Sequence, residues 1–139
     1  MQTPDPYGFG APAPASAYAG APDLLDEAPL VLAMAGEFLA DRLEPDAERE
    51  FRLRQAALSD RSHLAAVEQD QATELVDRLA RAAAQDAYDL MRHDALTSGE
   101  DLAEAGPWRG EHGPTSPHWE APGGLAAYVR TEYAAWSRP

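Results

Sequence analysis

The chain has 139 residues, which leaves room for one domain. Its formal net charge of -13 argues against nucleic acid or an anionic membrane surface as the main partner. The absence of cysteine excludes disulfides, thiolate metal sites and a cysteine nucleophile. All basic residues are Arg, and Lys, Asn and Ile are missing. Such a composition is typical of a GC-rich, bacterial genome.

Residues 1–22 are rich in Pro, Ala and Gly and contain a single charged side chain. They show no helical or strand period, and their prolines lack the backbone N–H, so we predict a disordered arm. The first basic residue is Arg42, so the charged segment of an export signal is missing. The longest apolar run, residues 29–36, is far shorter than the roughly 20 residues that span a bilayer. We therefore expect a cytoplasmic protein.

Residues 23–98 are predicted to form a helical hairpin core. Asp26 is suited to cap a first helix that ends near residue 43, and Pro29 fits its first turn. This helix is apolar around most of its circumference, so we expect it to be buried on several sides.

A second helical stretch begins after Pro45, where acid-first i,i+4 pairs of Glu and Arg indicate a solvated helix face. Apolar residues then recur at three- and four-residue steps from Leu64 to Met91, which predicts a continuous helix over that range. The pattern does not decide whether residues 46–92 form one helix or two.

The end of the chain combines a Pro/Gly-rich loop, residues 99–124, with an amphipathic helix over residues 125–139. The helix carries an apolar stripe of Leu125, Val129, Tyr133 and Trp136. No segment alternates with period two, so strands are not expected. The predicted fold class is all-α: a helical hairpin or small helical bundle with a disordered N-terminal arm and a short C-terminal aromatic helix.

Histidines are the main candidates for metal chemistry. The loop holds His112 and His118 beside two glutamates, and His93 precedes it. Histidine and carboxylate suit zinc, and three such ligands plus water would form an open catalytic site. No ligand spacing of a known metal motif such as HExxH occurs, however, so a rigid connector remains the simpler interpretation. Nucleophile and phosphate-binding signatures, GxSxG, GxGxxG and GxxxxGK[ST], are also absent.

Two short motifs resemble signals of a known family. Residues 108–110 read WRG and residues 128–132 read YVRTE. They match the W-x-G turn and the Y-x-x-x-[D/E] tail of the small helical-hairpin proteins exported by type VII secretion systems. In that family W-x-G joins two long helices near the middle, whereas here only a proline-rich loop and a short helix follow it. We therefore do not assign the chain to the family.

The alanine-rich helices predict a shallow core that buries little area per residue, which favours association. We therefore expect a non-enzymatic interaction protein: an adaptor, regulator or assembly component that binds a protein partner or itself, possible homodimers included, without cofactor, nucleic acid or membrane. Tyr128, Tyr133 and Trp136 are the predicted contact residues, unless they pack into the protein's own core. The alternative is a metal-binding protein or metal-dependent enzyme using His93, His112 and His118. A third function is an acidic decoy of nucleic acid.

Overall fold

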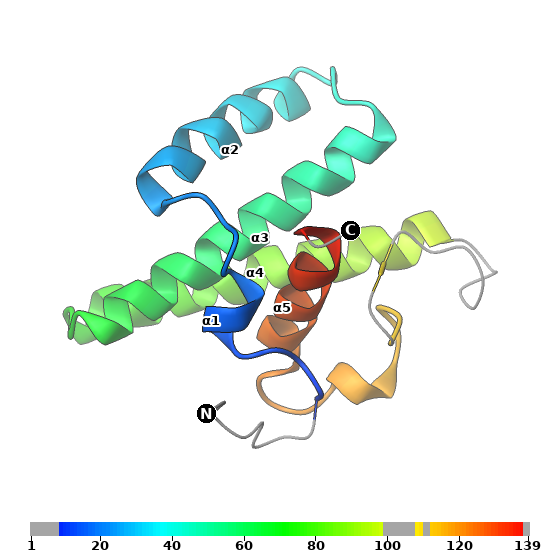
Figure 1. Cartoon of the computed structure of the whole chain (residues 1–139). Coiled ribbons are helices and arrows are strands. Elements are labelled where there is room, and N and C mark those ends of the chain that lie inside the picture. Colours follow the sequence, from blue (N-terminus) through cyan, green and yellow to red (C-terminus); the bar gives the residue numbers. More distant parts are fainter. Residues whose placement is uncertain (1–8, 99–107, 110–111, 138–139) are drawn as a thin grey trace.

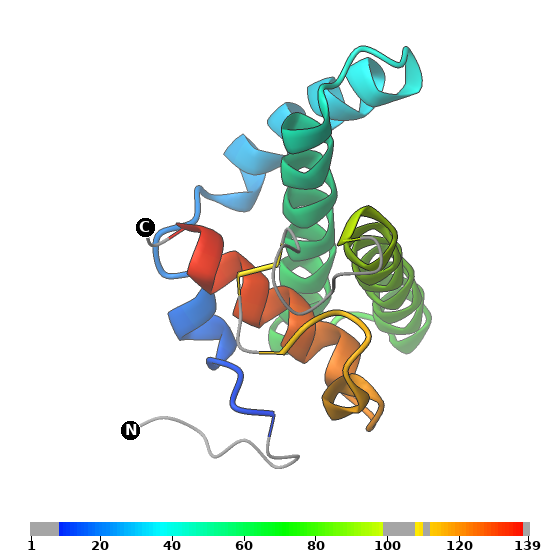
Figure 2. The same ribbon diagram turned by 90° about the vertical axis from the view of Figure 1, so that its right-hand side faces the viewer.

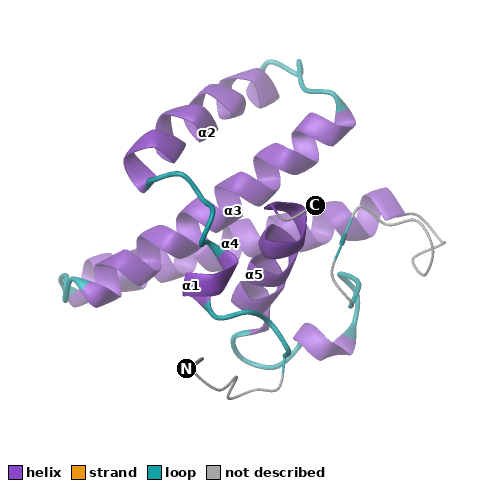
Figure 3. Ribbon diagram, viewed as in Figure 1, coloured by secondary structure: helices purple, strands orange, loops and turns teal. Residues whose placement is uncertain are grey.

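The computed structural model describes residues 9–98, 108–109 and 112–137. The described helices are α1 (Pro14–Ala17), α2 (Leu24–Leu39), α3 (Pro45–Glu68), α4 (Thr73–Ser98), the 3-10 turn η1 (Pro117–Trp119) and α5 (Gly124–Ser137). Within these ranges the elements are helices and loops, without a strand (Figure 3). The predicted all-α small bundle is thus confirmed. None of the described helices combines the length and apolar character needed to cross a membrane.

The bundle is built on α3 and α4, which run side by side as a long hairpin, with α5 laid across them (Figure 1). The core lies where these three helices meet, and Leu53, Leu90 and Tyr128 have no exposed surface there. Much of the remaining core is alanine, as the composition predicts, so the helices approach closely. The second view shows that α2 and α4 lie on different sides of α3 (Figure 2).

The continuous helix predicted from Leu64 to Met91 is wrong, because the chain breaks at residues 69–72 and forms two helices. At the end of α3, Asp70 adopts a left-handed conformation with φ of 53°. Its N–H donates to the Val67 carbonyl and the N–H of Gln71 donates to the Ala66 carbonyl. This is the Schellman arrangement that ends helices, built here on aspartate instead of the usual glycine.

The same arrangement ends α2 earlier than the predicted residue 43. Asp41 is left-handed with φ of 56°, and the N–H of Arg42 donates to the Glu37 carbonyl. Two aspartates, which give no strong stop signal in the sequence, therefore set the C-terminal ends of α2 and α3.

The prediction of a disordered arm over residues 1–22 does not hold for residues 9–22, while residues 1–8 lie outside the described residues. Phe9 is buried and stacks on Trp119, with ring centroids 6.0 Å apart. Tyr18 packs against Tyr133 and its hydroxyl donates to Asp60 across 2.6 Å. These aromatic contacts join to the bundle a segment that has almost no regular structure of its own.

Candidate interaction surface

The most exposed apolar side chains of the described chain gather on α2. Leu25, Leu32 and Leu39 are 89%, 74% and 83% exposed. They recur at every seventh position, which is close to two helical turns, so they line one side of the helix. We call these three residues the leucine stripe. The prediction that this helix is buried on several sides is wrong, since only one of its faces is covered.

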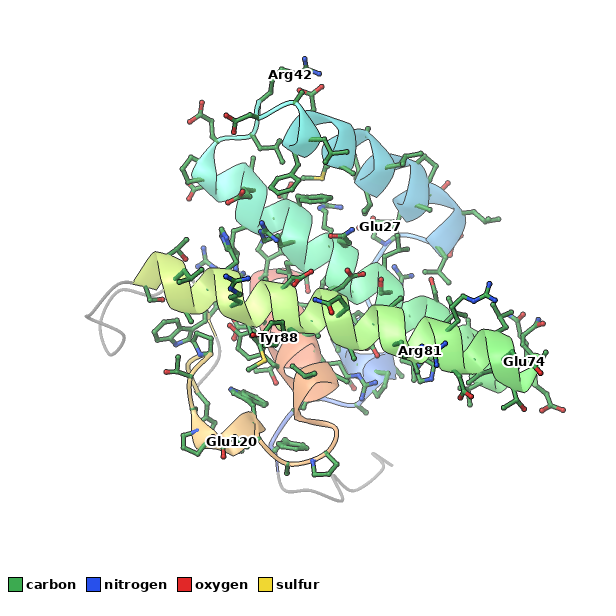
Figure 4. The ribbon with its side chains drawn as sticks, turned by 180° about the vertical axis from the view of Figure 1, so that it is seen from behind. Glu27, Arg42, Glu74, Arg81, Tyr88 and Glu120 are labelled. Carbon is green, nitrogen blue, oxygen red and sulfur yellow. The ribbon has the colours of Figure 1, made fainter. Side chains whose placement is uncertain are left out.

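The covered face of α2 packs mainly against α3. The Phe38 ring stacks on the Phe51 ring with centroids 5.3 Å apart, and Val31 is buried. The Glu27 carboxylate, 2% exposed, accepts a hydrogen bond from Arg54 across 3.1 Å. Glu27 lies in the space between the two helices (Figure 4). An aromatic contact and a buried ion pair thus fix the rotation of α2 so that the leucine stripe faces outward.

The residues that lie between the leucines on this side of α2 are small or compact and apolar. They are Ala28, Pro29, Ala35 and Gly36; Ala35 is partly buried and the other three are exposed. A Cβ atom added to Gly36 would have no neighbour within 4 Å. An exposed apolar helix face of this kind is the usual docking surface for a second helix, and contiguous apolar patches on isolated domains commonly mark interaction sites.

Two of the three predicted contact residues lie in the chain's own core, and the third is partly buried against it. Tyr128 is fully buried, Tyr133 is 3% exposed, and Trp136 packs beside Tyr133 with ring centroids 5.4 Å apart. The Arg54 guanidinium lies 5.0 Å from the centre of the Trp136 ring. Tyr128 and Tyr133 therefore pack into the chain's own core, and Trp136 lies at the edge of that core. A partner could reach Tyr128 only if α5 left the bundle.

Tyr128 belongs to a buried polar cluster that joins three helices. Arg49 on α3 donates to both oxygens of Asp94 on α4, across 3.1 and 3.0 Å, and to Glu132 on α5 across 3.0 Å. The Tyr128 hydroxyl donates to Asp94 across 2.5 Å. Burial, and next the Asp94 carboxylate, raise the pKa of Tyr128 far above its usual range, so the phenol stays protonated. The cluster links α3, α4 and α5 through buried hydrogen bonds.

Described residues of the WRG and YVRTE motifs make contacts within the fold. Glu132 accepts a hydrogen bond from the backbone N–H of Arg109 across 2.5 Å, which ties the loop to α5. Trp108 lies against Gly113, where an added Cβ would come within 3.1 Å of its ring. Gly110 lies outside the described residues. Tyr128 and Glu132 are buried, so they are not displayed as a surface signal in this structure.

The loop histidines form an internal stack. The rings of His112 and His118 lie 3.9 Å apart by centroid, and His118 Nε2 lies 2.6 Å from the Phe9 carbonyl oxygen, to which it donates. Trp119 Nε1 donates to the Gly113 carbonyl and its ring enters the core. The described part of the loop thus holds Trp119 in the core and contacts the N-terminal segment.

A metal site of His93, His112 and His118 requires the His93 side chain to lie close to the two loop histidines. His93 Nδ1 instead lies 3.4 Å from a Glu48 carboxylate oxygen on α3. Burial and the nearby Arg52 lower the pKa of His93. Among the residues that the structure describes, no group of three or more His or carboxylate side chains stands close enough to share a metal ion. Glu111, a flanking candidate, lies outside them.

A cleft of about 570 Å³ opens between α3, α4 and α5. Ala83 and Ala87 form one wall, Leu125 and Val129 another, and Trp119 closes one end. Asp60, His63 and Arg130 supply the polar edge, but Arg130 already binds Asp60 through two hydrogen bonds of 2.9 Å. The cleft is of a size that admits a small apolar molecule.

Comparison with protein-family models, with curated proteins and with solved structures found no match to this chain. The leucine stripe itself was not identified from the sequence. Its heptad spacing is visible in the sequence, but the spacing alone cannot say whether the chain's own core or a partner covers the stripe.

Proposed function

We propose that this protein is a non-enzymatic helical interaction protein, an adaptor, regulator or assembly component that binds its partner through the leucine stripe of α2. One observation carries the proposal: a helix that is apolar around most of its circumference is covered on one face only, which leaves Leu25, Leu32 and Leu39 exposed. At the generic value of about 25 cal/mol per Å² of apolar surface removed from water, covering such a face favours association.

The packing of α2 supports this role. Its contact with α3 is directional, because the buried Glu27–Arg54 pair and the Phe38–Phe51 stack set its rotation. A helix held this way presents its free face without first having to order, so less conformational entropy is lost on binding. The buried polar cluster around Arg49 and the histidine loop make their contacts within the fold, whereas the leucine stripe of α2 is exposed, which supports α2 as the binding element.

The test is site-specific photocrosslinking in cells that make the protein. A photoreactive residue at position 32 is expected to give one defined crosslinked product. The control carries the same residue at position 88 on α4, because Tyr88 is also exposed but lies on another helix. Equal or absent crosslinking at both positions would contradict a binding role for the leucine stripe. A product at position 32 alone supports it, whatever the partner is.

A further inference from the structure

We propose that the partner of the leucine stripe is the same stripe on a second copy of this chain, paired antiparallel about a two-fold axis at Leu32. The inference rests on the proposed function, since it names what α2 binds. A two-fold interface requires a surface that is complementary to itself. The outer face of α2 has that property.

The side-chain pattern reads nearly the same in both directions from Leu32. Leucines stand seven positions away on either side, at Leu25 and Leu39. Small or compact residues stand four positions away, at Ala28 and Gly36, and three away, at Pro29 and Ala35. In an antiparallel pair Leu32 therefore meets Leu32, Leu25 meets Leu39, and Ala28 meets Gly36 of the other copy.

Small residues at these places let the two helices approach closely. Ala28 and Gly36 are exposed, and space around the Gly36 Cα is open. Each exposed leucine of one copy can then fill a depression between leucines of the other, which is how side-chain ridges enter grooves in packed helices. A larger residue at position 36 would fill this depression and separate the helices.

The ends of α2 favour the antiparallel direction. Its N-terminal end carries the exposed carboxylates Asp23 and Asp26. Its C-terminal end is followed by Arg42, the first basic residue of the chain, whose guanidinium binds Glu37 across 2.7 Å. Antiparallel pairing sets the helix dipoles in opposite directions, and it brings toward Asp23 and Asp26 of the other copy an end of α2 where Arg42 offsets part of the charge of Glu37 and Asp41. Parallel pairing would place like ends together.

The charge of the chain limits the strength of this pairing. Each copy carries a net charge of -13, so two copies repel one another at low ionic strength. The 16 residues of α2 offer a contact only about 24 Å long. We expect a dimer that depends on protein concentration and becomes more populated as salt is added. A basic partner would show the opposite response, because salt weakens attraction between opposite charges.

Sedimentation velocity tests directly whether a second copy of the chain binds the leucine stripe. The wild-type chain is expected to shift from monomer to dimer as its concentration rises, and to shift further with added NaCl. Leu32→Glu should abolish the dimer. Leu96→Glu, an equally drastic change at an exposed leucine of α4, should retain it. Circular dichroism checks that both variants keep the wild-type helix content, which both exposed positions allow. A wild-type chain that stays monomeric at all concentrations and salt levels overturns the proposal.

Single cysteines test the geometry, since the chain has none of its own. A short bis-maleimide is expected to join Leu32→Cys to itself, and to join Leu25→Cys to Leu39→Cys when the two are mixed. Tyr88→Cys serves as the control and should give no dimer. Self-linking of Leu25→Cys in preference to the mixed pair would overturn the antiparallel arrangement. If no pair links while the photocrosslink at position 32 identifies another protein, self-pairing is wrong and the proposed function stands.

Discussion

At the scale of single residues, the bundle depends on one buried arginine. Arg49 is 8% exposed and neutralises two carboxylates, Asp94 and Glu132, which have no exposed surface. The Tyr128 phenol donates the further hydrogen bond that Asp94 accepts. Because buried carboxylates are costly without a partner, the four groups act as a unit. Their geometry specifies how α3, α4 and α5 meet, which a core of alanines alone would specify poorly.

We predict that Arg49→Met lowers the free energy of unfolding by about 3–5 kcal/mol, since it leaves two carboxylates buried without their counter-charge. Urea unfolding followed by circular dichroism measures the change. Arg81→Met provides the control, because Arg81 is exposed on α4, and it should stay within about 0.5 kcal/mol of wild type. Similar losses in the two variants would show that the Arg49 cluster contributes little.

At the scale of elements, aspartates in left-handed conformation set the lengths of α2 and α3. Asp41 and Asp70 each occupy the position after the helix cap, where glycine is usual. A side chain in this conformation brings its Cβ close to the backbone carbonyl, at a cost of roughly 1–2 kcal/mol for an ordinary residue and less for aspartate. The turn between α3 and α4 therefore carries local strain that the packing of the hairpin overcomes.

We predict that Asp70→Gly raises the free energy of unfolding by up to about 1 kcal/mol, because glycine adopts the left-handed conformation without the Cβ clash. Thermal and urea denaturation measure the gain. Gln69→Gly is the matched control: at φ of -84° any residue is comfortable, so glycine there should give no gain. A loss of stability in Asp70→Gly would mean that the aspartate side chain stabilises the turn.

At the scale of the whole molecule, a strongly acidic chain is held together by polar links between helices as well as by its core. Arg54 joins α3 to Glu27 on α2, and Arg130 joins α5 to Asp60 on α3. Arg49 also links helices, so three of the chain's 11 arginines form ion pairs between helices. Most of the 24 acidic residues remain for the surface. Repulsion between these negative charges is therefore stronger in the folded state than in the unfolded chain, where the charges lie farther apart.

We predict that the melting temperature rises between about 0.01 M and about 0.15 M NaCl, as the Debye length falls from about 30 Å to about 8 Å. Differential scanning calorimetry at low protein concentration measures it, so that dimer formation does not contribute. Glu68→Gln removes an exposed negative charge at the C-terminal end of α3, and this variant should melt higher at low salt and respond less to salt. A melting temperature that falls with salt would show that the interhelical ion pairs outweigh the net repulsion.

The proposed binding role of α2 also depends on the whole molecule. The leucine stripe is exposed because of how the other helices pack. Helix α3 covers the opposite face of α2, and neither α4 nor α5 extends over the stripe. A small bundle that leaves its most apolar helix half uncovered has apolar area available for association.

The sequence by itself determined the class of fold and much of its detail. Helical periodicity and the lack of period-two alternation predicted an all-α bundle, and the stripe of Leu125, Val129, Tyr133 and Trp136 predicted the helix that became α5. These features are local, since residues a few positions apart share a helix face whatever the fold. The shallow alanine core followed from composition alone.

Only the tertiary structure decided which apolar surfaces are covered. It placed Tyr128 and Tyr133 inside, left Leu25, Leu32 and Leu39 outside, and ordered Phe9 against Trp119 over 100 residues away in the chain. It also broke the helix at Asp70. Burial depends on partners distant in sequence, and aspartate is tolerated in the left-handed conformation without being a strong signal for it. Neither the burial of these side chains nor the helix break at Asp70 can therefore be predicted from a local sequence pattern.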